Sequence, residues 1–337
     1  MSARLLVFAF VSASFVAGCS QANVPATPGP AAPALARSLS SNIDFFNTVT
    51  PGSWPDYIVS GPQHALWFSE FYADKIGKVA TDGHMSEFSL PDGVDIEGIT
   101  AGPDGNIWFT APGASKIGRM TPSGSVTSFS IVGSNPSPRG ITTGPDGNLW
   151  YVEFYDSYLG RVTPSGTITR FQIPGSSSFP WGITAGPDGD LWFTESANNV
   201  VGRFDPKTLK FAASVSVPTA SSNPWGIVLV GKHIWFTERT GDKLAVVSGG
   251  KVHEFPIAQP GSYPEQIAAA SDGKLWFTEM QAGNVGQFDP KTGTFGQLIP
   301  LSKGDIPIGI ATGPDKNVWF CIASYSSLSQ VGKIVLH

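Results

Sequence analysis

Trp181-Gly-Ile-Thr-Ala-Gly-Pro-Asp-Gly-Asp-Leu-Trp-Phe-Thr-Glu195 is the stretch that decides the fold, because close copies of it recur along the whole chain. Its second tryptophan belongs to a column of seven aromatic positions spaced 41 to 43 residues apart. The column consists of Trp67, Trp108, Trp150, Trp192, Trp235, Trp276 and Trp319. A nearly constant period of this length indicates a repeat architecture, in which each repeat is one structural unit.

Each repeat predicts four short strands separated by turns. Two apolar runs flank the turn Asp188-Gly189, and a third run of the type Leu159-Gly160-Arg161 follows the tryptophan. A Thr-Pro-Ser-Gly turn at 163–166 then leads to a last run that ends at Phe171. Four strands in about 42 residues are typical of a propeller blade, and no window has helical periodicity. The sequence therefore predicts an all-β, seven-bladed β-propeller, with the Gly-Ile strand innermost and the Phe strand outermost.

Residues 43–49 read as an outer strand that has no blade before it. Phe46 precedes Ile58 by 12 residues, the same interval as that from Phe171 to Ile183. The last repeat, 306–336, stops one strand short. We therefore expect the N-terminal strand to complete blade seven, which would close the ring and leave no free sheet edge.

The chain before the repeats predicts export. Residues 1–19 have a basic start and an apolar core that is too short to span a bilayer. Their ending, Val16-Ala17-Gly18-Cys19, resembles a bacterial lipobox, which implies a lipoprotein signal peptide and lipidation of Cys19. An ordinary secretory signal is the alternative. Residues 20–42 are rich in Ala, Pro and Ser and predict a flexible tether, followed by the propeller at 43–337.

Composition and cysteine content limit the partners. The net charge is −5 and only 14% of residues are charged, so the chain has no basic footprint for nucleic acid. Cys321 is the only cysteine besides Cys19, so no disulfide framework is expected. These features predict a monomer of the bacterial cell envelope, on the periplasmic or surface side, that meets the membrane through its N-terminal lipid only.

Two phrases carry a family resemblance. Gly-Ile-Thr-Ala-Gly-Pro-Asp-Gly-Asn-Ile-Trp-Phe-Thr at 98–110 is followed by Lys-Ile-Gly-Arg-Met-Thr-Pro-Ser-Gly at 116–124. This pattern closely resembles the streptogramin B lyase (virginiamycin B lyase-like) family, and the resemblance covers all seven repeats. It implies a seven-bladed propeller. For the true lyases it also implies a magnesium-assisted elimination that opens an ester in a cyclic depsipeptide antibiotic.

The reactive groups that the resemblance implies are missing from this chain. The lyases resemble one another in a Glu-Pro-His-Gly segment that opens the last blade, in which the His acts as the base and the Glu helps to hold magnesium. This chain has Ile306-Pro307-Ile308-Gly309 there. A second metal-holding Glu three residues after the tryptophan of that blade corresponds to Ile322. An isoleucine neither accepts a proton nor binds a hard cation. We therefore expect no catalytic residue, no metal site and no cofactor; magnesium would be needed only if lyase activity had survived elsewhere.

A variable column just before the recurring glycine predicts a ligand-facing ring. A purely structural column should repeat one residue type, whereas this one changes from blade to blade. Its members are Asp56, Glu97, Arg139, Trp181, Trp225, Glu265 and Ile308. We expect the two indoles to form an aromatic platform and the guanidinium to hold a carboxylate, so the first six are the candidate ligand-binding residues. An ordinary polar rim is the competing interpretation.

A second column carries acidic residues three positions after the tryptophan. It contains Glu70, Glu153, Glu195, Glu238 and Glu279. Five glutamates are too regular for one reaction centre, so we expect a structural role as hydrogen-bond acceptors. The alternative is an acidic funnel that holds a divalent cation between Glu265 and Glu279.

Three functions remain open. The first is a non-catalytic envelope lipoprotein that binds a small molecule, peptide or protein at the channel mouth. The second is an enzyme with a relocated site, either a magnesium-dependent C–O lyase or a lactone or ester hydrolase, with Glu97, Glu265 and Glu279 as candidates. The third is a scaffold whose blade edges contact another envelope protein.

Overall fold

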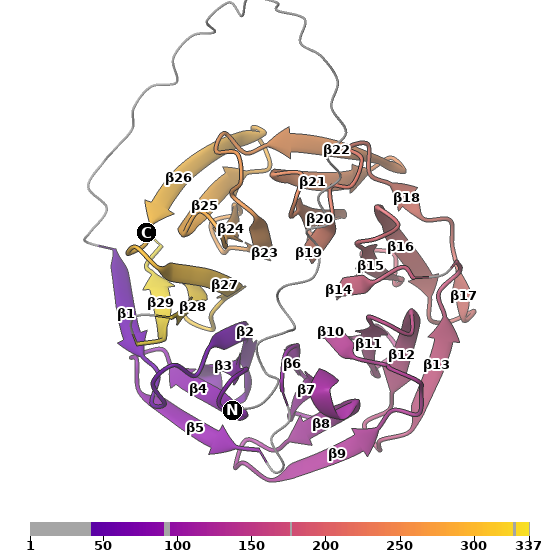
Figure 1. Ribbon diagram of the computed structural model, residues 1–337, viewed down its shortest axis with the longest axis horizontal. Coiled ribbons are helices and arrows are strands. Elements are labelled where there is room, and N and C mark those ends of the chain that lie inside the picture. The colour runs from indigo at the N-terminus through magenta and orange to yellow at the C-terminus, as the bar shows by residue number, and fades with distance from the viewer. Residues whose placement is uncertain (1–41, 91–94, 176, 326–327, 337) are drawn as a thin grey trace, which may run out of the picture. The chain divides into compact units, whose positions relative to one another are not determined.

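The computed structural model describes residues 42–336 except for 91–94, 176 and 326–327. The signal peptide, Cys19 and nearly all of the tether therefore lie outside the described residues. Residues 43–336 form seven antiparallel sheets that follow one another around a ring (Figure 1). This confirms the predicted seven-bladed propeller. Among the described residues, no helix has the length and hydrophobicity that crossing a membrane requires.

The strands are as follows. Blades one and two contain β2 (Pro55–Gly61), β3 (Ala65–Glu70), β4 (Lys75–Ala80), β5 (Met85–Ser89), and β6 (Ile99–Ala101), β7 (Ile107–Ala111), β8 (Lys116–Met120), β9 (Val126–Ser130). Blades three and four contain β10 (Pro138–Thr143), β11 (Leu149–Glu153), β12 (Tyr158–Val162), β13 (Ile168–Gln172), and β14 (Pro180–Ala185), β15 (Leu191–Glu195), β16 (Val200–Asp205), β17 (Lys210–Phe211), β18 (Val215–Ser216). Blades five and six contain β19 (Pro224–Val230), β20 (His233–Glu238), β21 (Lys243–Ser248), β22 (Lys251–Pro256), and β23 (Pro264–Ala269), β24 (Leu275–Glu279), β25 (Asn284–Asp289), β26 (Thr294–Pro300). Blade seven contains β27 (Asp305–Thr312), β28 (Val318–Ser324), β29 (Gln330–Ile334) and β1 (Ile43–Asn47).

The recurring motifs explain how each blade packs. In every blade the strand that carries the recurring isoleucine is innermost and the strand that carries the repeat tryptophan is second, so the large side chains fill the layers between blades. The glycine of the third strand lies under the second-strand aromatic ring. A Cβ at Gly118, for example, would collide with the ring of Phe109. The ring leaves no room for a side chain at this position, which explains why glycine recurs in the Ile-Gly-Arg pattern of the third strand.

The N-terminal strand closes the ring as predicted. β1 pairs with β29 in antiparallel register, with Phe46 opposite Val331. The Phe46 ring stacks on Trp319 with a centroid separation of 5.6 Å, which repeats the Phe–Trp contact of other blades. The two ends of the propeller chain are thus joined by backbone pairing and by an aromatic contact.

Blade four departs from the simple four-strand prediction. Its outer strand is divided into β17 and β18, and its register against β16 shifts by one residue between these pieces. A shift of this kind is a β-bulge, which leaves the intervening residues outside the ladder. Elsewhere the described chain adds two single-turn 3-10 helices, η1 (Pro62–His64) and η2 (Pro112–Ala114), in the turns of blades one and two.

Candidate functional site

The innermost strands bring the variable column together at one mouth of the ring. Arg139 of blade three forms a buried ion pair with Glu97 of blade two. The Trp225 indole N–H of blade five donates to Glu265 Oε1 of blade six over 2.7 Å. Asp56 of blade one is close enough to Glu97 and Glu265 for both to raise its pKa. The six predicted residues therefore form one buried cluster, although each comes from a different blade.

The two tryptophans stack on each other rather than presenting an open platform. The ring centroids of Trp181 and Trp225 are 3.6 Å apart, with an interplanar angle of 24°. The Arg139 guanidinium lies over Trp181 at 4.9 Å, and Arg239 lies over Trp225 at 4.2 Å. A guanidinium, two indoles and a second guanidinium thus follow one another around the mouth. These cation–π and stacking contacts already use ring faces that we expected a ligand to occupy.

Tyr57 crosses the middle of the ring, a feature that the sequence analysis missed. Its hydroxyl accepts hydrogen bonds from the Trp181 indole N–H, over 2.9 Å, and from the Gln266 side-chain amide, over 3.0 Å. Blade one is thereby linked directly to blades four and six. The side chains that lie between the inner strands therefore bond to one another across the axis.

The positions where the recurring glycine is replaced could have predicted this contact from the sequence. This glycine directly follows the variable column in five blades, where a Cβ has no room: at Gly98 it would lie 2.5 Å from the Arg139 carbonyl of the next blade. Blades one and six instead carry Tyr57 and Gln266 at this position. Departure from glycine at a crowded position indicates a side chain that turns toward the axis, and these are the two side chains that meet there.

Burial and charge set the proton affinity of the cluster. Burial raises the pKa of Asp56 well above its usual value, and the carboxylates of Glu97 and Glu265 add to this. Burial also raises the pKa of Glu97, against the opposing effect of Arg139, and of Glu265, against that of Arg239. The Arg239 Nε atom lies 2.9 Å from Glu265 Oε2. Three acidic groups thus share the positive charge of two guanidinium groups in a buried site.

The residues that correspond to the magnesium and base positions of the lyases do not fit those roles. Ile308 packs in an apolar cluster with Trp54, Phe71 and Ala323, and Ile306 lies against the same cluster. Ile322 is fully buried in a separate apolar cluster between blades six and seven. None of these side chains offers an oxygen ligand for a hard cation. The described residues also contain no group of three His, Cys, Asp or Glu side chains that could hold a metal ion.

The glutamate column has mixed surroundings. Glu153 is ion-paired with Arg170, Glu195 accepts from Asn198, and Glu279 accepts from Asn284 over 2.9 Å. These three have the acceptor role that we expected. Glu70 and Glu238 differ, because each lies beside a serine hydroxyl and a second glutamate, Ser53 and Glu87 or Ser222 and Glu254, and burial raises the pKa of each to about 8.

The cation alternative for Glu265 and Glu279 meets competing contacts. Glu265 is engaged by the Trp225 indole and faces Arg239, while Glu279 accepts from Asn284 of its own blade. Each carboxylate therefore has a partner of its own.

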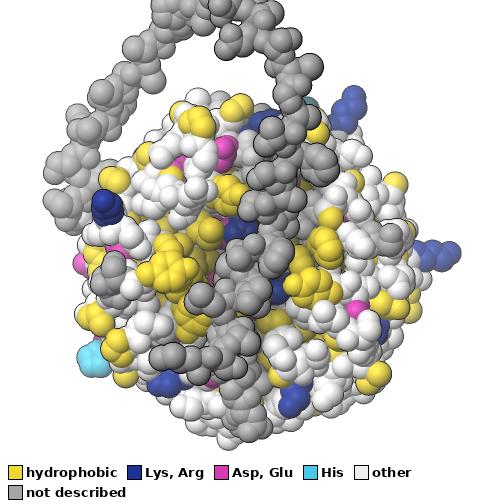
Figure 2. Space-filling model, in the orientation of Figure 1, with side chains coloured by type: hydrophobic (Ala, Val, Ile, Leu, Met, Phe, Trp, Pro, Cys, Tyr) yellow, Lys and Arg dark blue, Asp and Glu magenta, His cyan; other side chains and the backbone are white. Residues whose placement is uncertain are grey.

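Aromatic side chains surround the cluster at the mouth. The Trp54 ring lies 5.2 Å from the Tyr72 ring and 4.7 Å from the Tyr325 ring, measured between centroids, and Tyr325 is 77% exposed. A second group joins Phe154, Tyr155 and Phe179 to Trp181. In Figure 2, hydrophobic side chains gather on opposite sides of the centre of the ring, near the positions of β27 and β14 in Figure 1. We call Trp54, Tyr72 and Tyr325 the blade-seven aromatic group, and Phe154, Tyr155, Phe179 and Trp181 the blade-four aromatic group.

Solved structures of streptogramin lyases share this architecture. The chain is 31% identical, with a TM-score of 0.81, to a catalytically inactive His-to-Ala variant of virginiamycin B lyase from Staphylococcus aureus with quinupristin; the match covers 88% of this chain and 99% of that one. A streptogramin B lyase structure is 32% identical, with a TM-score of 0.82, and the match covers 88% of this chain and 97% of that one.

Sequence comparisons agree with the structural ones. Virginiamycin B lyase of Nocardia farcinica (strain IFM 10152) is 28% identical over 118 residues, which are 35% of this chain and 40% of that protein. The virginiamycin B lyase family model matches residues 36–232 and 209–337. With its seven blades, its repeated motifs and these matches, the chain belongs to the virginiamycin B lyase family.

Proposed function

We propose that this chain is a non-catalytic, ligand-binding member of its family, exported to the bacterial cell envelope and anchored by a lipid on Cys19. The observation that carries the proposal is the replacement of the family's reactive groups by Ile306, Ile308 and Ile322 in apolar packing. Without a titratable group or an oxygen ligand at these positions, the family's elimination has neither its base nor its metal.

The mouth still offers a surface for a ligand. The blade-seven and blade-four aromatic groups flank a cluster that carries carboxyl and guanidinium groups, and their outermost members, Tyr325 and Tyr155, are 77% and 48% exposed. Large aromatic side chains beside a few buried polar groups are typical of sites for amphipathic molecules that carry rings. The solved S. aureus relative was obtained with quinupristin. We therefore propose a ring-bearing small molecule or a cyclic peptide as the ligand class.

Calorimetry with quinupristin tests both parts of the proposal. We expect wild-type protein to bind quinupristin, with or without magnesium, while mass spectrometry finds no linearised product. Tyr155→Ala combined with Tyr325→Ala should weaken binding about tenfold or more, since truncated aromatic anchors commonly cost over 1 kcal/mol. Leu209→Ala, at an exposed side chain of the outer edge, is the matched control. Turnover by the wild type would contradict the non-catalytic proposal, and unchanged affinity of the double variant would place the ligand elsewhere.

A relocated acid–base site is the second candidate, favoured by one observation. Asp56 is buried, its pKa is raised well above the ordinary value, and two guanidinium groups lie near it. A protonated carboxyl group of this kind can donate a proton to a leaving group. If the chain opens lactones or esters, Asp56→Asn should abolish turnover while leaving the fold intact by circular dichroism. Turnover that persists in this variant would remove Asp56 from the reaction.

The envelope anchor is tested separately. Cys19→Ser should move the protein from the membrane fraction to the soluble exported fraction, and mass spectrometry of the wild type should find a diacylglycerol-bearing N-terminus. An unmodified Cys19, or a membrane-bound Cys19→Ser variant, would contradict the lipid anchor. Size-exclusion chromatography with light scattering should give a monomer if the propeller works alone.

A further inference from the structure

Five of the seven repeat tryptophans stack on a phenylalanine of the outer strand. The centroid separations are 5.5 to 5.7 Å, and the rings are 16° to 29° from parallel. The pairs are Trp67–Phe88, Trp108–Phe129, Trp150–Phe171, Trp235–Phe255 and Trp319–Phe46. In each blade this phenylalanine pairs with the residue that precedes the third-strand glycine, or Ala245 in blade five, so the position is defined by register.

The same register position is aliphatic in the two remaining blades. Val215 occupies it in blade four, opposite Val201, and Ile299 occupies it in blade six, opposite Val285. Neither Trp192 nor Trp276 contacts another aromatic ring among the described residues. The two blades therefore keep the tryptophan but lack the ring that packs on it elsewhere.

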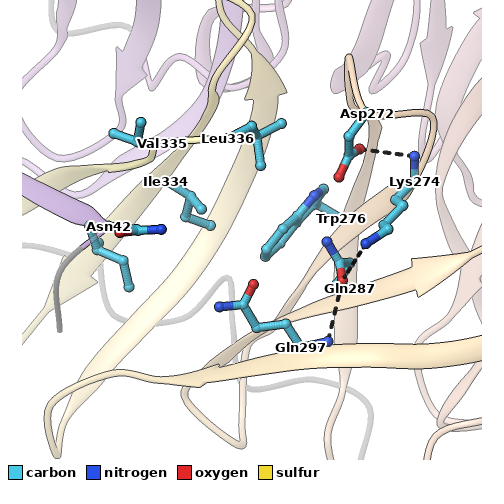
Figure 3. Close-up of a pocket in the computed structure, with 10 residues that line it drawn as sticks. Asn42, Asp272, Lys274, Trp276, Gln287, Gln297, Ile334, Val335 and Leu336 are labelled. Atoms are coloured by element: carbon cyan, nitrogen blue, oxygen red, sulfur yellow. Dashed lines mark hydrogen bonds between the residues drawn. The ribbon is translucent and has the colours of Figure 1, made fainter. Parts of the chain in front are cut away.

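A cavity adjoins each of these tryptophans, and the two cavities differ in size. The one beside Trp276 has a volume of about 180 Å³, and Figure 3 shows Ile334 and Leu336 on one side of the indole and Lys274 and Gln287 on the other. Ile299 is buried there and Trp276 is 0% exposed, so the missing phenylalanine has been replaced by other packing.

The cavity beside Trp192 is larger and remains accessible. Its volume is about 410 Å³, and Trp192, Val215, Ile234 and Val247 form its apolar lining. Trp192 is 8% exposed, whereas the five tryptophans that stack on phenylalanine are 0 to 5% exposed. The bulge between β17 and β18 and the shorter side chain of Val215 together leave the space beside this indole unfilled.

Two aspartates hold the Arg203 guanidinium in place at this cavity. The Arg203 guanidinium lies 5.2 Å from the centre of Trp192, and Asp188 and Asp190 pair with it over 2.7 and 2.5 Å. In blade two the equivalent Arg119 lies over both rings of its pair, at 5.6 Å from Trp108 and 5.8 Å from Phe129. An aromatic ring in the blade-four cavity would thus meet an indole face and a fixed guanidinium, as Phe129 does.

We infer that the blade-four cavity is a binding site for an aromatic ring with a polar substituent, such as a phenol. The ring takes the place of the missing phenylalanine beside Trp192 and Arg203, and its polar group faces Ser214 and Lys232 at the rim. The ring belongs either to a free small molecule or to a tyrosine side chain of a peptide, because both present the same group. The inference is independent of the proposed function, since none of these residues belongs to the variable column.

The test is an NMR titration of the tryptophan indole N–H signals of the full chain, with the Trp192 signal assigned from Trp192→Phe. We expect p-cresol to shift this signal with a dissociation constant on the order of 1 mM. Cyclohexanol, a saturated ring of similar size, should bind about two- to tenfold more weakly, because it lacks the aromatic contacts. A Gly-Tyr-Gly peptide that binds more tightly than p-cresol would identify a peptide as the source of the ring; equal or weaker binding would identify a small molecule.

Two variants make the inference falsifiable. Val215→Phe supplies the missing ring and should abolish the p-cresol shift. Phe129→Val gives blade two the residue of blade four and should create a second site, seen at the Trp108 signal. If Val215→Phe does not fold, Val215→Leu, which fills the cavity in part, should weaken binding. A Trp192 signal that p-cresol leaves unchanged in the wild type, or shifts equally in a folded Val215→Phe variant, would overturn the inference.

Discussion

Replacing Glu70 by glutamine should stabilise the protein, and the gain should grow as pH rises. Glu70 is 0% exposed, and its carboxyl group lies beside the Ser53 hydroxyl and the Glu87 carboxyl group. Burial raises its pKa from 4.5 to about 8; the nearby Ser53 hydroxyl opposes this effect, and Glu87 adds to it. The folded protein therefore keeps Glu70 protonated at a pH where the unfolded chain ionises it.

The direction and size of the effect follow from this difference. The native state binds a proton that the unfolded state releases, so wild-type stability is lost as pH rises from about 4.5 to about 8. A pKa rise of this size corresponds to roughly 5 kcal/mol at most, because each pKa unit is worth about 1.4 kcal/mol. Structural relaxation and water penetration reduce the penalty, and we expect about 2–4 kcal/mol above pH 8. Glutamine has no ionisation to suppress, so the variant escapes this loss.

Urea denaturation at several pH values measures the effect. The difference in unfolding free energy between Glu70→Gln and wild type should be small near pH 5 and should reach its full value near pH 9. Glu238→Gln should behave alike, because burial also raises the pKa of Glu238 to about 8. Glu153→Gln, from the same column, is the comparison: it removes the ion pair with Arg170, which keeps Asp156 as its second partner, and near pH 5 it should destabilise by about 1.5–3 kcal/mol. A difference for Glu70→Gln that does not change with pH would refute the reasoning.

Three further substitutions test the ring and its closure, each by urea denaturation against wild type. Tyr57→Phe leaves two partly buried N–H donors without their acceptor and should cost about 1–3 kcal/mol; an unaltered midpoint would mean that the contact across the axis adds nothing. Arg139→Met leaves the Glu97 carboxylate buried and unpaired, at a cost of about 3–5 kcal/mol, and adding Glu97→Gln should recover much of it; equal stability of the single and double variants would contradict the pairing. Phe46→Ala removes the stacked ring that closes blade seven and should cost about 1–3 kcal/mol, more than the exposed control Phe45→Ala; an equal effect of the two would argue against closure by this contact.

The repeat pattern was sufficient to predict the ring. The number of blades, the order of strands within them and the closing strand at 43–47 all follow from spacings along the chain. These predictions succeeded because strand periodicity and blade period are local properties that each repeat states again.

The pairing of side chains at the mouth required the tertiary structure. Sequence reasoning placed Trp181 and Trp225 in one column, but their mutual stacking depends on the spacing and the rotamers of neighbouring blades. The link from Tyr57 to Gln266 joins equivalent positions of blades one and six, 209 residues apart, but the period does not say that these two side chains meet across the axis. Likewise, Glu153 and Glu70 share one column, and the outer strand decides that the first meets Arg170 while the second lies beside Glu87. The sequence by itself determined the blade that is repeated, whereas packing around the closed ring decided which side chains meet. Those contacts depend on distances between blades, which the order of residues along the chain does not contain.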